Sequence, residues 1–210
     1  MAALMDHLGH EKVALVGHDR GARVGTRFAK DFRVRVDRFV AMGRNIPTRV
    51  IADTYDAALA RQGYWFFTFL QVPDLPESLI AGNEEAWLTH FYRSWSYNPD
   101  MLTAEEIDVY VRAYPAAGAV RGSCMDYRAA AEDVAQDRED ADQLIDCPVL
   151  TMRGENFSAV GEAYDVLDVW KGMARDVRGS PFPSAATSAR KKQPEVVNAE
   201  LLAFLDGWSG

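Results

Sequence analysis

The chain has 210 residues, 48% of them hydrophobic and 26% charged, which is enough for a domain with a sizeable buried core. Its formal net charge of −8 argues against nucleic acids and anionic membranes as partners. No apolar run is long enough to span a bilayer, and residues 1–10 lack the pattern of a secretory signal. The two cysteines, Cys124 and Cys147, lack metal-ligand spacing, so we expect reduced thiols in a cytoplasmic protein.

Residues 12–32 predict a strand, a sharp turn and a helix. The apolar run VALV at residues 13–16 is typical of a buried strand in a parallel sheet, and Gly17 ends it. Small residues then accompany Val24 and Phe28, which lie four apart on one helical face. The chain therefore turns abruptly from a buried strand into an amphipathic helix.

The rest of the chain divides by its patterning into helical and strand segments. Residues 49–146 carry long helical patterns rich in aromatic side chains and almost no strand signal. Helices are expected there at residues 84–95, 103–114 (opening on a capping box) and 121–139. Elsewhere we expect helices at residues 2–8, 164–174 and 195–208, and strands at residues 38–42, 147–152 and 176–179.

This alternation predicts the α/β class with a parallel sheet. The last helix carries one apolar face, made of Val197, Leu201, Phe204 and Leu205. We predict an α/β core from residues 1–48 and 147–210. Residues 49–146 are predicted to be a helical cap over the carboxyl ends of the strands, where ligands bind in open α/β sheets.

At the centre of the first strand–turn–helix segment stands GHDRG, residues 17–21, a G-x-D-x-G form of the nucleophile elbow. Glycines suit this turn because the nucleophile has strained dihedral angles and neighbouring backbone passes close by. A carboxylate at the centre, here Asp19, attacks carbon directly and forms an ester without needing a base to deprotonate it. The alternative is that Asp19 only caps the helix.

The motif GHDRGARV, residues 17–24, resembles the nucleophile motif of the α/β-hydrolase superfamily, in its haloacetate dehalogenase and epoxide hydrolase branch. Residues 63–77 (GYWFFTFLQVPDLPE) and 123–129 (SCMDYRA) resemble two cap motifs of this branch, and residues 147–155 (CPVLTMRGE) resemble its late strand and loop. The resemblance implies an α/β-hydrolase-type parallel sheet with a helical cap insertion. Because complete members have strands before the nucleophile strand, we expect a partial core whose N-terminal strands are missing.

By this resemblance Asp19 would be the nucleophile that displaces a halide or opens an epoxide. Arg20 and Arg23 match a pair that holds a substrate carboxylate, which fits the bidentate binding of carboxylates by guanidinium groups. Tyr127 matches a cap tyrosine that donates to the leaving halide or epoxide oxygen. Alternatively, Arg23 pairs with a surface acid and Tyr127 is packed in a core with its hydroxyl satisfied.

The branch also uses an acid and a histidine that follow the nucleophile. The histidine slot falls on Thr187, whereas His90, the one histidine downstream of Asp19, lies in the helical block on what we predict to be a packed aromatic face. Glu155 is the candidate acid after the strand at residues 147–152.

Two interpretations follow. The first is a hydrolase that acts through an Asp19 ester on a haloacid, haloalkane-type or epoxide substrate. The second is a truncated or decayed relative that binds such molecules without turnover, because no histidine would activate water to hydrolyse the ester. A short frameshift between about residues 184 and 192 would account for the missing histidine. Both involve a small-molecule substrate with no cofactor and no metal, and a homodimer stays open.

Overall fold

The computed structural model describes residues 1–43, 46–95, 102–154, 165–182 and 194–206. These residues form two compact units. Unit 1 contains Met1–Pro47 together with the described residues from Asp140 onward, and unit 2 contains Thr48–Glu139. The functional division into a core and a cap stays a prediction.

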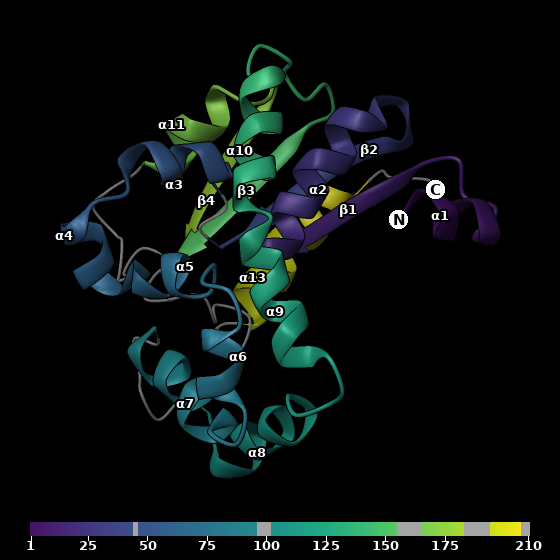
Figure 1. The fold of residues 1–210 in the computed structure, drawn as a ribbon. Coiled ribbons are helices and arrows are strands. Elements are labelled where there is room, and N and C mark those ends of the chain that lie inside the picture. The colour runs from purple at the N-terminus through teal and green to yellow at the C-terminus, as the bar shows by residue number, and fades with distance from the viewer. Residues whose placement is uncertain (44–45, 96–101, 155–164, 183–193, 207–210) are drawn as a thin grey trace. The chain divides into compact units, whose positions relative to one another are not determined.

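Unit 1 is built on a four-stranded parallel sheet in the order β1-β2-β3-β4 (Figure 1). The parallel sheet predicted from the sequence is therefore confirmed, and the carboxyl ends of its strands meet at one edge. The strands are β1 (Val13–His18), β2 (Val36–Met42), β3 (Val149–Gly154) and β4 (Val177–Phe182). The helices of this unit are α1 (Ala2–Leu8), α2 (Arg20–Asp31), α11 (Val166–Lys171) and α13 (Pro194–Leu205), with a 3₁₀ turn at Arg33–Arg35.

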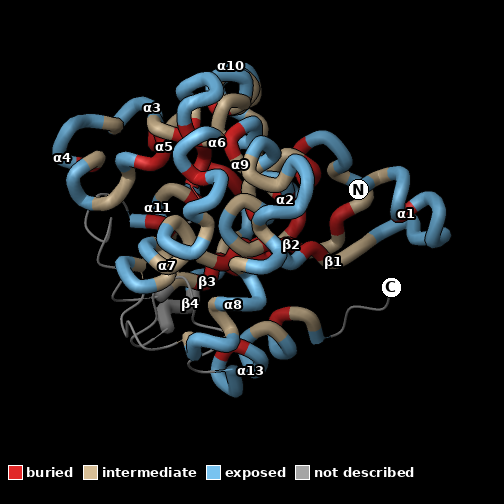
Figure 2. Tube along the Cα trace, turned by 60° about the horizontal axis from the view of Figure 1, so that its bottom comes forward, coloured by how far each residue is buried: buried red, intermediate tan, exposed pale blue. Residues whose placement is uncertain are grey.

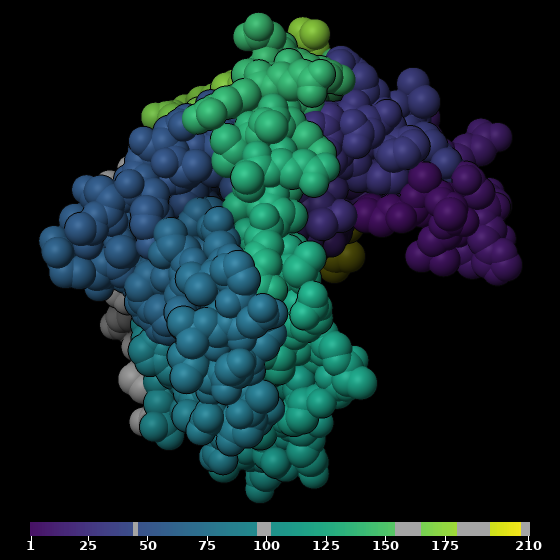
Figure 3. Space-filling view, in the orientation of Figure 1, coloured from purple at the N-terminus to yellow at the C-terminus, as the bar shows by residue number. Residues whose placement is uncertain are grey.

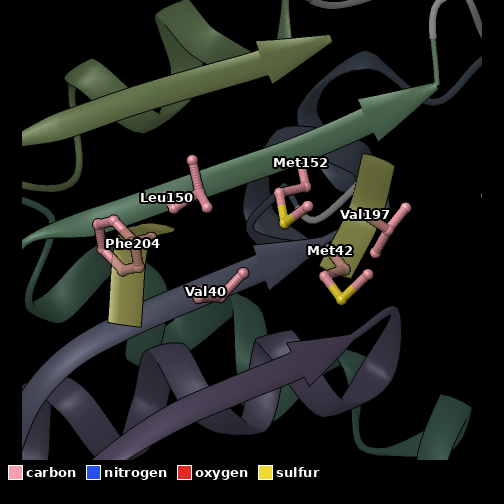
Figure 4. Packing of buried hydrophobic residues seen from close by; sticks show 6 residues of the cluster. All are labelled: Val40, Met42, Leu150, Met152, Val197 and Phe204. Carbon is pink, nitrogen blue, oxygen red and sulfur yellow. The ribbon is translucent and has the colours of Figure 1, made fainter. Parts of the chain in front are cut away.

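Helices cover both faces of this sheet, because alternate side chains of a strand point to opposite sides. On one face, the ring centroids of Phe39 and Trp170 of α11 lie 5.7 Å apart. On the same face, α2 lies so close to the sheet that a Cβ added at Gly25 would be 2.7 Å from the Phe39 ring. On the other face, Leu201 and Leu205 of α13 pack against a buried cluster, so the apolar face predicted for the last helix is confirmed. Figure 4 shows that cluster: Val40, Met42, Leu150, Met152, Val197 and Phe204.

Within unit 1, the central strands of the sheet are the most deeply buried part (Figure 2). Phe39, Val40 and Ala41 of β2 are fully buried, as is Val149 of β3. By contrast, most of α1 is exposed, and Met5 is its buried residue. The core of unit 1 therefore lies around β2 and β3.

The far end of α2 is fixed by polar contacts with a segment 110 residues later in the chain. Lys30 is only 8% exposed, and its Nζ lies 2.7 Å from a carboxylate oxygen of Asp140 and 3.1 Å from the Asp140 carbonyl oxygen. Arg27 lies 2.5 Å from the second carboxylate oxygen. Burial alone would raise the pKa of Asp140, but hydrogen bonds from Lys30 and Arg27 outweigh it and lower that pKa.

The described residues of unit 2 form helices and turns. Its elements are α3 (Thr48–Thr54), α4 (Ala57–Leu59), a π-helical turn (Ala60–Tyr64), α5 (Trp65–Phe69), α6 (Leu75–Ile80), α7 (Glu84–Ser94), α8 (Ala104–Ala113), α9 (Ala119–Arg128) and α10 (Ala130–Glu139). The capping box predicted at Thr103 is confirmed. α9 and α10 follow one another in a continuous column (Figures 1 and 3). None of the described helices in either unit has both the length and the hydropathy needed to cross a membrane.

The helix predicted over residues 121–139 is confirmed except at one residue, Ala129, where it is interrupted. Ala129 separates α9 from α10, but its φ of −71° and ψ of −6° stay in the right-handed helical region, and its N–H donates to the carbonyl oxygen of Met125 at 3.1 Å. Alanine gives no signal for such a break, because it has the highest helix propensity. Arg128, the last residue of α9, binds Glu77 and the carbonyl oxygen of Val72.

Unit 2 has an aromatic core. Its buried members are Phe66, Leu70, Ile80 and Cys124, and partly buried against them lie Tyr64, Phe69, Trp87, Phe91, Trp95, Tyr114, Val120 and Tyr127. Aromatic side chains bury large areas and gain further from edge-to-face contacts. This core explains the aromatic run that begins at residue 64.

The first and last helices of unit 2 are fastened together. The backbone N–H of Arg49 donates to the Asp137 carboxylate at 3.1 Å, at the start of α3. Arg138 of α10 lies 2.6 Å from Asp53 of α3. The first and last helices of unit 2, α3 and α10, therefore lie next to each other.

The buried hydroxyl of Thr151 in β3 gives a test of the sheet packing. Its side chain is 2% exposed, and Oγ1 has no hydrogen-bond partner among the described residues. We expect Thr151→Val to raise the free energy of unfolding by about 1 kcal/mol, because it removes an unsatisfied polar group at nearly constant volume. Urea unfolding followed by circular dichroism measures this. The control Val149→Thr, on the same face of the strand, should lower the free energy of unfolding by about 1–3 kcal/mol. A loss of stability in Thr151→Val would contradict the conclusion that the Thr151 hydroxyl is buried without a hydrogen-bond partner among the described residues.

Candidate functional site

Asp19 lies between the end of β1 and the start of α2, at the carboxyl edge of the sheet. Its φ of 53° and ψ of −121° place a non-glycine residue in a strained backbone conformation. Its N–H donates to the carbonyl oxygen of Met42 at 3.1 Å, and its carbonyl oxygen accepts from the N–H of Ala22 at 3.0 Å. Hydrogen bonds on both sides hold this strained residue, which is itself exposed to solvent.

The turn is tight because Gly17 lies directly against the first turn of α2. A Cβ at Gly17 would be 2.6 Å from the carbonyl oxygen of Gly21 and 2.7 Å from Cα of Ala22. Both are backbone atoms that cannot move aside, so this position requires glycine. At Gly21 itself, a Cβ would meet nothing within 4 Å. The sequence argument for a glycine is confirmed at the first position of the motif and is wrong at the last.

Asp19 occupies the N-cap position of α2, yet its side chain accepts no capping hydrogen bond. A capping aspartate normally has dihedral angles in the β region and accepts from the second or third helical N–H. The geometry therefore does not support the alternative that Asp19 only caps the helix.

The two arginines of the motif lie in the first turns of the same helix. Arg20 follows Asp19 directly, and Arg23 lies four positions after Asp19, so it projects from the same side of the helix. Nη1 of Arg23 is buried and has no hydrogen-bond partner among the described residues, in which this side chain also forms no ion pair. A desolvated guanidinium N–H without an acceptor is costly, and a bound carboxylate would satisfy it.

The sequence also predicts a catalytic acid and a histidine position that follow Asp19 in the chain. Residues 44–45, Glu155 and Thr187 lie outside the described residues. Gly43, which follows β2, donates its N–H to the carbonyl oxygen of Met152 at 2.8 Å, so the ends of β2 and β3 lie side by side. The ring of His90 lies 5.7 Å from Trp65 and 5.2 Å from Phe91, which confirms the aromatic neighbours predicted for it, but the residue is exposed rather than packed.

Tyr127 lies in the last turn of α9, partly buried in the aromatic core of unit 2. Its ring centroid is 5.7 Å from that of Phe66, with an interplanar angle of 89°, and 6.2 Å from that of Phe67, with an angle of 84°. Core packing therefore describes the ring itself. Asp19, Arg20 and Arg23 lie together in unit 1, whereas Tyr127 belongs to unit 2.

An ion pair next to Tyr127 was not predicted from the sequence. Arg128 binds Glu77 through two hydrogen bonds of 2.5 and 2.8 Å, and it also donates to the Val72 carbonyl oxygen at 2.5 Å. The hydrogen bonds from Arg128 lower the pKa of Glu77 from 4.5 to about 2. The partners lie 51 residues apart. The signal that could have found them is that each of the two cap motifs contains one partner.

Both thiols are free and buried. Burial raises the pKa of Cys124, and it raises that of Cys147 to about 11, so both are protonated at neutral pH and poor nucleophiles. Across the described ranges, no three His, Cys, Asp or Glu side chains gather into a metal site.

A parallel sheet with helices on both faces, and a strained acidic residue at its carboxyl edge, is the arrangement of an α/β hydrolase. The family described as alpha/beta hydrolase fold matches residues 1–115, and the chain belongs to this family.

Among curated proteins, the chain is similar to a fluoroacetate dehalogenase from Burkholderia sp, with 31% identity over 86% of this chain and 59% of that protein. It is also similar to a soluble epoxide hydrolase from Corynebacterium sp. (strain C12), with 27% identity over 96% of this chain and 69% of that protein. A solved structure from Nostoc sp PCC 7120, described as a candidate α/β hydrolase, matches with a TM-score of 0.89 and 35% identity, covering 98% of this chain and 70% of that one. The resemblance to the dehalogenase and epoxide hydrolase branch is confirmed, and the chain spans about three fifths of the dehalogenase.

Alanine substitutions at Gly17 and at Gly21 should affect the stability of the protein differently. Gly17→Ala should lower the free energy of unfolding by about 3 kcal/mol, because its Cβ overlaps backbone atoms of α2. Gly21→Ala should leave stability unchanged or raise it by up to about 1 kcal/mol, because the position is helical and open. Thermal and urea unfolding of the two variants measure the difference. Equal effects would show that the turn is not as tight as described.

The Glu77–Arg128 pair predicts a pH-dependent contribution to stability. Because the pKa of Glu77 falls from 4.5 to about 2 on folding, its contribution is fully present above pH 4.5 and is lost as the pH falls through 2. Glu77→Gln should therefore destabilise the protein by about 1–3 kcal/mol at pH 7 and by much less at pH 2.

Urea unfolding of both proteins at several pH values tests this expectation. Asp108→Asn is the control, because it removes an exposed pair with Arg112 and should cost about 0.5 kcal/mol or less. A difference between wild type and Glu77→Gln that stays constant from pH 7 to pH 2 would refute the assignment.

Proposed function

We propose that this protein is a hydrolase that uses Asp19 as a nucleophile, forming an ester with a small haloacid, haloalkane-type or epoxide substrate. The observation that carries the proposal is the conformation of Asp19. A carboxylate held at positive φ between strand and helix, without a capping role, has the position of an elbow nucleophile. The similarity to a fluoroacetate dehalogenase and an epoxide hydrolase supports the substrate class.

In the first step a carboxylate oxygen of Asp19 attacks the carbon that bears the leaving group. With a haloacid, a carbon–oxygen bond forms, the carbon–halogen bond breaks, and the halide leaves with its electron pair. With an epoxide, the ring carbon–oxygen bond breaks, and the released oxygen takes a proton from the hydroxyl of Tyr127.

Arg20 and Arg23 support the haloacid within this class. Arg23 follows Asp19 by one helical turn, and its buried Nη1, which has no partner among the described residues, would donate to a carboxylate on the substrate. Such a contact would hold the carbon next to the substrate carboxylate in front of the nucleophile. An epoxide without a carboxylate would leave this N–H unsatisfied.

The second step is hydrolysis of the ester by water, and it needs a base. With threonine at position 187, the chain as given lacks a histidine at the place where the branch carries one. The alternative function, binding without turnover, therefore shares the first step and stops at the ester. Accumulation of the Asp19 ester distinguishes binding without turnover from complete hydrolysis.

Intact-protein and peptide mass spectrometry after incubation with 2-bromopropionate, and separately with styrene oxide, tests the proposal. On the peptide that contains Asp19 we expect an adduct with the full substrate mass for the epoxide, and with the substrate mass less HBr for the haloacid. Asp19→Asn should abolish it. Released product in excess of enzyme would indicate turnover, and an adduct that persists would indicate the alternative. If the folded wild type forms neither adduct nor product, the Asp19 proposal fails.

A further inference from the structure

We propose that Phe66 and Phe67 of α5 are positioning residues that fix the direction of the Tyr127 hydroxyl. This inference rests on the proposed function, which makes Tyr127 the proton donor to the leaving oxygen. All three side chains belong to unit 2.

Two rings stand edge-on to Tyr127. The interplanar angles are 89° with Phe66 and 84° with Phe67, at centroid distances of 5.7 and 6.2 Å. Consecutive residues of a helix point about 100° apart, so the two phenylalanines contact Tyr127 from different directions. The tyrosine ring is therefore restricted in two directions rather than one.

Both phenylalanines are themselves held. They are 6% and 5% exposed, which leaves them little room to change rotamer. Phe66 packs against Phe91 and Trp95 at centroid distances of 5.5 and 5.0 Å, and Phe67 lies 5.9 Å from Tyr55. The two rings thus form a rigid support.

The backbone beneath Tyr127 is fixed as well. Its neighbour Arg128 is bound to Glu77 and to the Val72 carbonyl oxygen, which anchors the last turn of α9. One turn earlier, Cys124 is fully buried in the same core. Because both its backbone and its ring are held, Tyr127 points its hydroxyl group in one direction from α9.

Direction matters because proton donation needs the hydroxyl within hydrogen-bond reach of the oxygen that develops negative charge. A displacement of about 1 Å of a catalytic group can cost up to about 100-fold in rate. Halide departure from a bromoacid depends less on a proton donor than epoxide opening does. Loss of the support should therefore affect epoxides more than bromoacids.

The experiment measures ring motion and chemistry in the full-length protein. Protein labelled with 3-fluorotyrosine gives a ¹⁹F signal for Tyr127, assigned through its loss in Tyr127→Phe. In Phe66→Leu and in Phe67→Leu we expect a changed ¹⁹F shift and a broader line than in the wild type, because a tyrosine ring that loses one of its two supports samples more than one side-chain orientation. The rate of adduct formation on Asp19 should fall about 10- to 100-fold with styrene oxide in these variants, and less than about 3-fold with 2-bromopropionate.

Phe69→Leu is the matched control, since Phe69 lies on the same helix and packs against Trp65 and Trp87. It should change neither the Tyr127 signal nor the rates, and circular dichroism verifies that each variant folds. Phe67→Tyr keeps a ring at this position and should retain both the wild-type ¹⁹F signal of Tyr127 and the wild-type rate.

The outcomes separate the two proposals. If Tyr127→Phe slows epoxide opening but Phe66→Leu and Phe67→Leu behave like Phe69→Leu, the positioning role is overturned and the proposed function stands. If Tyr127→Phe leaves the rate of epoxide opening unchanged, the proton-donor role fails, and the positioning inference falls with it.

Discussion

The contact between Gly17 and the first turn of α2 is the constraint on which unit 1 depends. Gly17 lies so close to the backbone of α2 that no Cβ fits between them. The chain therefore turns from strand to helix within a single residue, Asp19. That residue takes a positive φ, and hydrogen bonds to Met42 and Ala22 on either side offset the strain. Further along α2, Gly25 allows the helix to lie against Phe39 of β2. One helix is thus fixed along its length, with Asp19 at its N-cap and both arginines in its first turns.

The local features of this fold could be predicted from the sequence because their signals are local. Apolar runs bounded by glycine gave β1, and the 3.6-residue period of Val197, Leu201 and Phe204 gave the face of α13. The elbow could be predicted because five consecutive residues carry it.

Long-range polar contacts could not be predicted in this way. Lys30 and Asp140 are 110 residues apart, and Glu77 and Arg128 are 51 apart, so no periodicity joins them. The one-residue interruption at Ala129 could not be predicted either, because alanine has the highest helix propensity and gives no local signal for it. The strain at Asp19 could be predicted from the motif, whereas the burial of Arg23 Nη1 without an acceptor among the described residues depends on tertiary packing that has no local signal.

The fastening of α3 to α10 bears on how the chain folds. β2 and β3 are neighbours in the sheet although all of unit 2 lies between them in the sequence. Closing so long a flexible loop is entropically costly and slow. When unit 2 folds first, the contacts of Arg49 with Asp137 and of Asp53 with Arg138 bring its two ends together, and β3 then meets β2 across a short effective loop. Pulse-labelled hydrogen exchange would show this order as protection of α10 before β3, and simultaneous protection would exclude it.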